Sequence, residues 1–196
     1  DFRRLATKSV EALFAFAMPL IVISEICSPQ IIQIIAGPGY EGAIMPMRIV
    51  MPLMLVIGYE QILVLQMLAP LKKDTAIFTN SLIGAAVSLT FNVLLVSHFG
   101  CNGTAVVWIF SEFVVMISAQ FFATKYIGFY PPIKAFIKRI ILVLPIVAVC
   151  YFVNSLMYHI FWSILVISAI SIAYSLIIEI IVLKNQLIID NMNRII

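Results

Sequence analysis

Residues 76–122 read AIFTNSLIGAAVSLTFNVLLVSHFGCNGTAVVWIFSEFVVMISAQFF, and this stretch decides the fold. It holds two apolar segments, 76–96 and 104–122, that are separated by little more than the turn Gly100-Cys101-Asn102-Gly103. A helix needs ~20 mostly apolar residues to cross ~30 Å of hydrocarbon at a rise of about 1.5 Å per residue. A helix also satisfies its own backbone hydrogen bonds in lipid, which an open strand cannot do. The stretch therefore predicts two spanning helices joined by a tight turn.

Four further segments of the same kind lie at 12–35, 44–68, 140–157 and 160–183. None of them alternates apolar and polar residues with the strict period of a barrel strand. Turn-forming or charged groups separate the segments at 37–39, 70–74 and 130–132, and the basic residues 133–139 predict a short interfacial helix before the fifth span. We predict an all-α polytopic membrane protein, in which residues 1–196 form a single bundle of six transmembrane helices.

The composition excludes a soluble domain. Hydrophobic residues make up 63% of the chain and charged residues 11%, whereas soluble domains hold roughly 45–50% and about 25%. The mean hydropathy is +1.14. The three cysteines are far apart, which argues against a disulfide framework or a metal site, and enzyme motifs are absent from the sequence. We expect no catalytic residue, no metal, no cofactor and no nucleic-acid partner.

The distribution of the 12 Lys and Arg residues predicts the orientation in the membrane. When the loops alternate between the two faces, Arg48 alone lies on one face. The other face receives Arg3, Arg4, Lys8, Lys72, Lys73, Lys125, Lys134, Lys138, Arg139, Lys184 and Arg194. By the positive-inside rule the basic face is cytoplasmic, so both ends of the chain lie inside and the turns at 37–41, 100–103 and 154–159 face outward.

Three carboxyl groups lie inside the predicted spans, namely Glu25, Glu60 and Glu112. A carboxylate in hydrocarbon is costly and usually faces a cavity or a partner. One interpretation is a hydrophilic cavity in which a carboxylate binds a proton, a cation or sugar hydroxyls. The other is hydrogen bonding between helices, or a carboxyl kept neutral, and for Glu25 a position near the outer interface. Glu11 and Glu179, close to Lys8 and Lys184, are expected at the interface.

Arg48 is the one cation predicted on the outer side, early in the second span. Its guanidinium group could contact a phosphate-bearing substrate in a cavity. It could equally snorkel to the outer headgroups.

Several spans carry polar side chains along one face. In the second span, Tyr59 and Gln66 are seven residues apart. Spans three, four and six carry the sets Asn80, Gly84, Ser88, Asn92; Thr104, Ser111, Ser118; and Ser168, Ser171, Ser175. Such faces favour close helix packing, with the lining of a cavity as the alternative. Prolines at 19, 29, 46, 52 and 145 allow bends in or at the ends of the spans.

The order and spacing of short motifs over 28–125 resemble the C-terminal half of Wzx-type polysaccharide (O-antigen) flippases, in the multidrug/oligosaccharidyl-lipid/polysaccharide exporter superfamily. Two positions depart from the family pattern: Phe99 stands for a tyrosine, and Glu60 for what is usually an amide. The matching motifs are Ser28-Pro29-Gln30-Ile31-Ile32, Gly37-Pro38-Gly39-Tyr40 with Ala43, Arg48-Ile49-Val50-Met51-Pro52, Ile62-Leu63 with Gln66-Met67-Leu68-Ala69-Pro70, Gly84-Ala85-Ala86 with Asn92, Gly100-Cys101-Asn102-Gly103-Thr104-Ala105, and Ser111-Glu112.

The resemblance implies one half of a transporter with twelve or more spans, whose N-terminal half precedes Asp1 in the same polypeptide. It implies a bacterial cytoplasmic (inner) membrane protein of polysaccharide biosynthesis. The expected substrate is an O-antigen, capsule or exopolysaccharide repeat unit on undecaprenyl diphosphate, which moves from the cytoplasmic to the outer leaflet by alternating access. Membrane lipid and a polysaccharide polymerase are the further expected partners. The residues that we expect along the substrate or ion pathway are Glu25, Arg48, Tyr59, Glu60, Gln66, Asn92, Ser111 and Glu112.

Other interpretations stay open. Within the superfamily, the chain could be a cation-coupled drug exporter or a lipid II flippase. From another class, it could be a polytopic membrane enzyme, although that would need a cluster of catalytic residues in loops that are here short and plain. A six-span scaffold without a transport role is the last alternative.

Overall fold

The computed structural model describes residues 2–156 and 159–181. Several positions named above lie outside these residues. They are the first residue, Asp1, the predicted ends of the fifth and sixth spans at Met157 and Leu183, and the cations Lys184 and Arg194.

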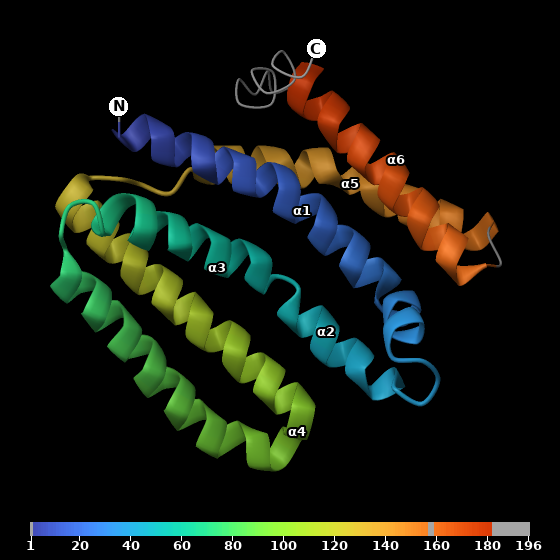
Figure 1. The fold of residues 1–196 in the computed structure, drawn as a ribbon, viewed down its shortest axis with the longest axis horizontal. Helices are drawn as coiled ribbons and strands as arrows, with labels where there is room; N and C mark the ends of the chain where they lie inside the picture. Colours follow the sequence, from blue (N-terminus) through green and yellow to red (C-terminus); the bar gives the residue numbers. More distant parts are fainter. Residues whose placement is uncertain (1, 157–158, 182–196) are drawn as a thin grey trace. The chain divides into compact units, whose positions relative to one another are not determined.

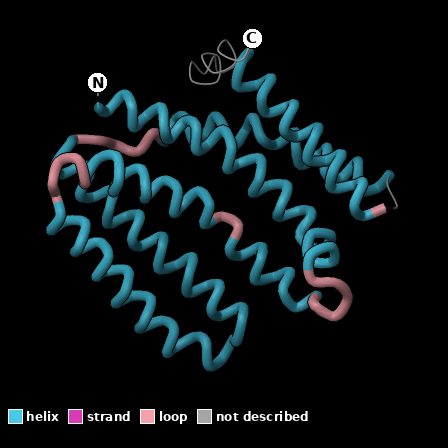
Figure 2. Tube along the Cα trace, in the orientation of Figure 1, coloured by secondary structure: helices cyan, strands magenta, loops and turns pink. Residues whose placement is uncertain are grey.

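The described residues form helices joined by short loops, and they contain no strand (Figure 2). Six helices are long and apolar enough to cross a membrane by length and composition. Figure 1 shows them in the order of the chain, labelled by element. The prediction of an all-α protein with six transmembrane helices is confirmed, and the chain is a multi-pass membrane protein. The single-bundle assignment of 1–196 stays a prediction.

Five of the six spans lie in four long helices. Their bounds are α1 Phe2–Ile35, α4 Asp74–Ile127 (which contains the third and fourth spans), α5 Ile133–Leu156 and α6 Ile160–Ile181. The second span is divided among η1 Glu41–Ala43, α2 Ile44–Val50, α3 Leu53–Gln61 and η2 Ile62–Leu68.

Two predicted boundaries are wrong for the same reason. Helix α1 begins at Phe2, ten residues before the predicted start of the first span. The basic segment 133–139 is not a separate interfacial helix but the first two turns of α5. Hydropathy marks the part of a helix that fits the hydrocarbon, whereas the hydrogen-bonded helix continues through polar residues beyond it.

The second span contains two irregularities. Pro52 follows the end of α2 and serves as the N-cap of α3, while Pro19, Pro29 and Pro145 lie inside continuous helices. The last two turns, Ile62–Leu68, form a π-helix, a rare form that is frequent at functional sites. The span therefore changes its helical repeat directly after the polar group at residues 59–61.

The long helix α4 is a hairpin of two antiparallel arms (Figure 1). Its reversal occurs at Gly100, whose φ of 54° and ψ of −131° break the helical path. Residues on the two arms pack against each other along the hairpin. The ring centres of Phe91 and Phe110 lie 4.8 Å apart, and a Cβ added at Gly84 would lie 2.5 Å from Val115 Cγ2. Gly84 thus fits the packing interpretation of the polar stripe, because a larger residue would push the arms apart.

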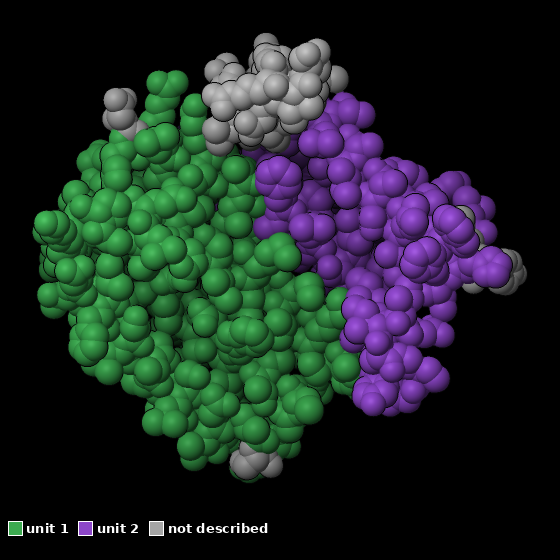
Figure 3. Space-filling view, viewed as in Figure 1, with its two compact units in different colours: residues 1–13, 42–133 green, residues 14–41, 134–196 purple. Residues whose placement is uncertain are grey.

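The chain divides into two compact units, coloured separately in Figure 3. Unit 1 holds residues 1–13 and 42–133, and unit 2 holds residues 14–41 and 134–196. Within unit 1, the π-helix contributes the fully buried side chains of Leu63, Met67 and Leu68. The core of unit 2 is an apolar cluster of Ile23, Cys27, Ile146, Cys150, Val153 and Ile167.

Candidate functional site

Glu60 is the centre of a buried polar cluster in unit 1. It lies in the last turn of α3 and is 7% exposed. The amide of Asn80, on the first arm of α4, donates to Glu60 Oε1 at 3.1 Å, and the neighbouring Gln61 amide donates to Oε2 at 3.1 Å. Each carboxylate oxygen therefore accepts one amide hydrogen, and the Asn80 contact joins two helices.

The cluster has more acceptors than donors. Asn80 is 2% exposed, and its own Oδ1 is buried without a hydrogen-bond partner. Glu112, half-buried on the second arm of α4, is near enough to interact electrostatically with Glu60. A buried acceptor without a donor is costly, and two carboxylates repel each other when both are ionised.

This acceptor set suits a positive occupant. A carboxylate offers about four lone-pair sites, of which the two amides use only part, and the free Asn80 Oδ1 adds another acceptor. A proton on one carboxyl group, or a hard cation among oxygen ligands, would remove both the repulsion and the missing donor. No group of three or more His, Cys, Asp or Glu side chains among the described residues could hold a metal ion. The acceptors on Glu60, Glu112 and Asn80 thus suit a proton or a cation.

Tyr59 belongs to a second polar network beside the first. Its hydroxyl donates to Gln120 Oε1 on the second arm of α4 at 2.5 Å. The Gln120 amide in turn donates to Thr124 Oγ1 at 3.0 Å and to the Phe129 carbonyl at 2.9 Å. Thr124 Oγ1 also donates to Phe129 O at 2.9 Å. The network ties the second span to the end of α4, so Tyr59 has a structural partner close to Glu60.

Gln66 does not join Tyr59, although the two were expected on one face. Tyr59 is buried, whereas Gln66 is exposed. The π-helix Ile62–Leu68 begins after Tyr59 and contains Gln66. It has more residues per turn than an α-helix, so a spacing of seven no longer returns to the same face. The sequence pattern assumed a regular α-helix and is wrong at this position.

Asn92 and Ser111 bond within α4. The Asn92 amide donates to Ser88 O at 2.8 Å and to Ser88 Oγ at 3.2 Å. The Ser111 hydroxyl donates to Trp108 O at 3.0 Å. These bonds engage the Asn92 amide nitrogen and the Ser111 hydroxyl inside their own helix, so they do not join either side chain to the Glu60 cluster.

Glu25 and Arg48 belong to other elements of the chain. Glu25 is half-buried on α1 in unit 2, whereas the Glu60 cluster belongs to unit 1. Arg48 is half-buried in the last turn of α2, on the other side of the Pro52 break from Glu60. The structure thus brings together Glu60 and Glu112 from the expected set, with Tyr59 alongside.

Three partners were not among the expected site residues: Gln61, Asn80 and Gln120. Asn80 was noted in the polar stripe of the third span, and its signal was an amide in an apolar helix. The contacts themselves join residues 20 and 61 positions apart, and helical periodicity carries no information on such pairs.

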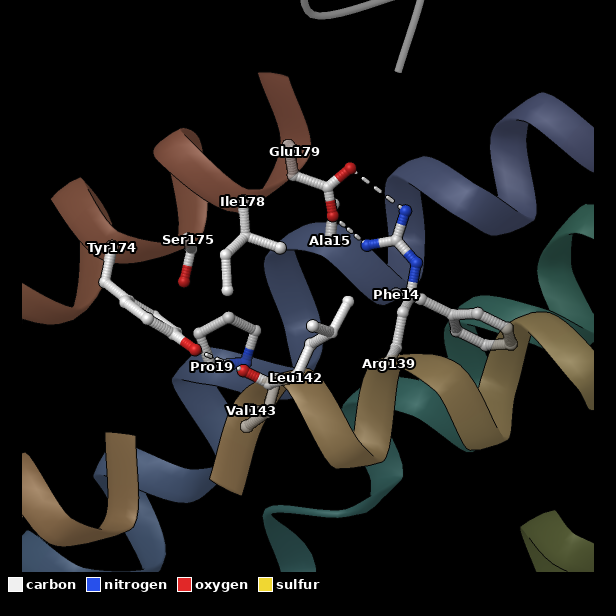
Figure 4. A pocket seen from close by; sticks show the side chains of 10 residues that line it. All are labelled: Phe14, Ala15, Pro19, Arg139, Leu142, Val143, Tyr174, Ser175, Ile178 and Glu179. Carbon is white, nitrogen blue, oxygen red and sulfur yellow. Dashed lines mark hydrogen bonds and ion pairs between the residues drawn. The ribbon is translucent and has the colours of Figure 1, made fainter. Parts of the chain in front are cut away.

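Unit 2 contains a buried ion pair that the sequence did not indicate. Arg139 of α5 and Glu179 of α6 are 6% and 4% exposed and form a two-pronged contact, in which Arg139 Nη2 lies 3.1 Å from Glu179 Oε2 and Nη1 bonds Oε1 (Figure 4). Both residues were expected at the membrane interface, and they are 40 residues apart in the sequence. The Tyr174 hydroxyl donates to Leu142 O at 3.0 Å, so α6 is held to α5 at two levels.

Two small spaces adjoin this ion pair. One, drawn in Figure 4, measures about 20 Å³, which is room for one water molecule beside Arg139, Tyr174 and Pro19. The other is an apolar groove of about 220 Å³ between α1 and α6. Its lining consists of Ala15, Phe16, Pro19, Leu20, Ile23, Ile172, Ser175, Leu176 and Glu179.

The chain was compared with known protein families, with curated proteins and with solved structures, and none of the three comparisons found a match.

Proposed function

We propose that this chain is one half of a transporter that flips undecaprenyl-diphosphate-linked oligosaccharide across the bacterial inner membrane by alternating access. The observation that carries the proposal is the buried pair of Glu60 and Asn80, with the half-buried Glu112 near it, inside helices of membrane length. Ionisable groups at such depth are costly and usually serve a pathway. The motif order over 28–125 supports the substrate class.

In this proposal the cluster couples transport to a proton or a monovalent cation. The two carboxyl groups and the unpartnered Asn80 Oδ1 can hold the proton or cation or be without it, and the net charge of the cluster differs between these two states. The irregular second span, with its break before Pro52 and its π-helix after Glu60, supplies backbone that can bend when the charge changes. A lipid-linked glycan needs only a wet path for its sugar head, since the prenyl tail can stay in the bilayer.

A cation-coupled drug exporter of the same superfamily is the second candidate. The same cluster favours it, because ion coupling does not depend on the identity of the substrate.

Deletion of the full gene, followed by location of radiolabelled lipid-linked oligosaccharide, tests the proposal. We expect repeat units to accumulate in the cytoplasmic leaflet and surface polysaccharide to disappear. Glu60→Gln and Glu112→Gln variants test the coupling, and Glu41→Gln, which removes an exposed carboxylate outside the cluster, controls for a change of charge alone. Unchanged surface polysaccharide in the deletion strain would reject the flippase function and direct attention to export of soluble cations. Normal transport by both Gln variants would reject the coupling role alone.

A further inference from the structure

The base of the α4 hairpin in unit 1 carries a concentration of positive charge around one tyrosine. Lys73, the N-cap of α4, places its Nζ 4.7 Å from the centre of the Tyr126 ring. Lys125 places its Nζ 5.5 Å from the centre of the same ring. Both distances are within the range of a cation–π contact, so two ammonium groups share one aromatic side chain.

A third cation is held at the same helix end. Arg3 Nη2 donates to the carbonyl of Ile127, the residue after Tyr126. Gly128 makes this approach possible, because its φ of 67° ends the helix and a Cβ there would lie 3.1 Å from Arg3 Nη2. The guanidinium group is therefore held at the carbonyl of Ile127, the residue next to Tyr126 in the chain.

The acidic side chains at this end do not balance these charges, because Asp74, the first residue of α4, offsets only one of them. None of Arg3, Lys73 and Lys125 forms an ion pair with a carboxylate in the part of the chain that the structure describes. The carbonyl end of a helix provides the equivalent of about half a negative charge. The two positive charges that remain after Asp74 is counted still exceed that amount several-fold, so the helix end alone does not explain the cluster, and the excess would attract an anion.

Apolar side chains lie next to these cations. Tyr126 is 42% exposed. Phe78 lies one turn after Asp74 on the first arm and is 69% exposed, and Phe121 lies one turn before Lys125 on the second arm and is 61% exposed. Lysine and tyrosine side chains with a polar tip and an apolar body are typical of the level of lipid headgroups. A phosphate bound at the cations would carry its hydrocarbon chains toward these exposed rings.

We propose that Arg3, Lys73, Lys125 and Tyr126 form a binding site for the phosphate of an anionic phospholipid. The two ammonium groups and the remaining guanidinium N–H groups donate to phosphate oxygens, and Tyr126 holds the lysines in place while its hydroxyl provides one more donor. The site lies outside the Glu60 cluster and would regulate the transporter through the composition of the surrounding leaflet.

Native mass spectrometry of the delipidated full-length protein tests the site. The protein is titrated with phosphatidylglycerol, and with phosphatidylcholine as the zwitterionic control. We expect preferential retention of phosphatidylglycerol, and about 25-fold weaker binding in the Lys73→Gln/Lys125→Gln variant, since each basic residue near a membrane surface contributes about a fivefold factor. The matched control is Lys134→Gln/Lys138→Gln, which removes the same charge from two exposed residues of α5 and should retain binding.

Three further measurements decide the remaining outcomes. Lys73→Arg/Lys125→Arg keeps both charges and the cation–π contacts, so retained binding supports the site even where the Gln variant folds poorly. Equal binding of the two phospholipids, or an equal loss in the α5 control, overturns the proposal. Displacement of the phospholipid by millimolar inorganic phosphate, or stronger retention of a polyprenyl diphosphate, overturns the phospholipid as the occupant.

Discussion

Asn80 donates an amide hydrogen to Glu60 across 3.1 Å, and the same amide group leaves its own oxygen buried without a partner. One side chain thus both satisfies a buried carboxylate and creates an unmet acceptor beside it. A purely structural contact between helices would gain nothing from the second feature, whereas a site that receives a proton or a cation would use it.

Replacement of Asn80 by alanine should destabilise the protein. The change removes a donor from a buried carboxylate, a loss that costs about 1–3 kcal/mol. Asn92→Ala is the matched control on the same helix arm, because its amide bonds only within α4, and we expect less than about 1 kcal/mol. Thermal unfolding of the two purified variants compares them, and an equal loss of stability would contradict the assigned contact.

The ion pair of Arg139 and Glu179 predicts a non-additive mutation pattern. Arg139→Leu or Glu179→Leu alone should each cost about 3–5 kcal/mol, because a buried charge then loses its partner. The double replacement should recover most of that loss, since both charges are gone and leucine packs well. A double-mutant cycle on unfolding free energies measures the coupling. Additive losses would show that the two side chains do not interact.

Three glycines predict three different outcomes for alanine. At Gly84 a Cβ meets the stiff Val115 side chain at 2.5 Å, and we expect a cost of about 1–3 kcal/mol. At Gly58 it meets the flexible end of Leu13, also at 2.5 Å, so the cost should be smaller. At Gly42 nothing lies within 4 Å, and we expect no loss. The order of melting temperatures of the three variants checks this ranking.

Cysteine labelling tests both packing and orientation. Cys101 is exposed at the tip of the α4 hairpin, whereas Cys27 and Cys150 are fully buried in the core of unit 2. A membrane-impermeant maleimide applied to spheroplasts should therefore label Cys101 but neither Cys27 nor Cys150, and Cys101→Ser should remove the labelling from these 196 residues. Labelling only after the membrane is opened would place the tip inside and reverse the orientation predicted from the basic residues.

The sequence was sufficient for the spans but not for the contacts between them. Hydropathy located six helices, since ~20 apolar residues in a row have one stable form in lipid. The charge of Glu60 marked a site, but its partner Asn80 lies on another helix, and no local pattern joins the two. Gln66 was placed wrongly because the π-helix changes the repeat on which the argument relied. Arg139 was assigned to the basic loop because its partner, Glu179, lies 40 residues later on another helix, and no local pattern indicates their contact.

The hairpin formed at Gly100 also bears on how this part of the protein enters the membrane. Between Asp74 and Glu112 the chain carries no Asp, Glu, Lys or Arg, and the residues that reach furthest from the base are Phe99, Gly100 and their neighbours. Both arms can enter the bilayer together from one side, with Asp74 and Lys125 left behind at the base. The leading loop then crosses without moving a permanent charge through hydrocarbon, and the pair can be inserted as one unit during synthesis.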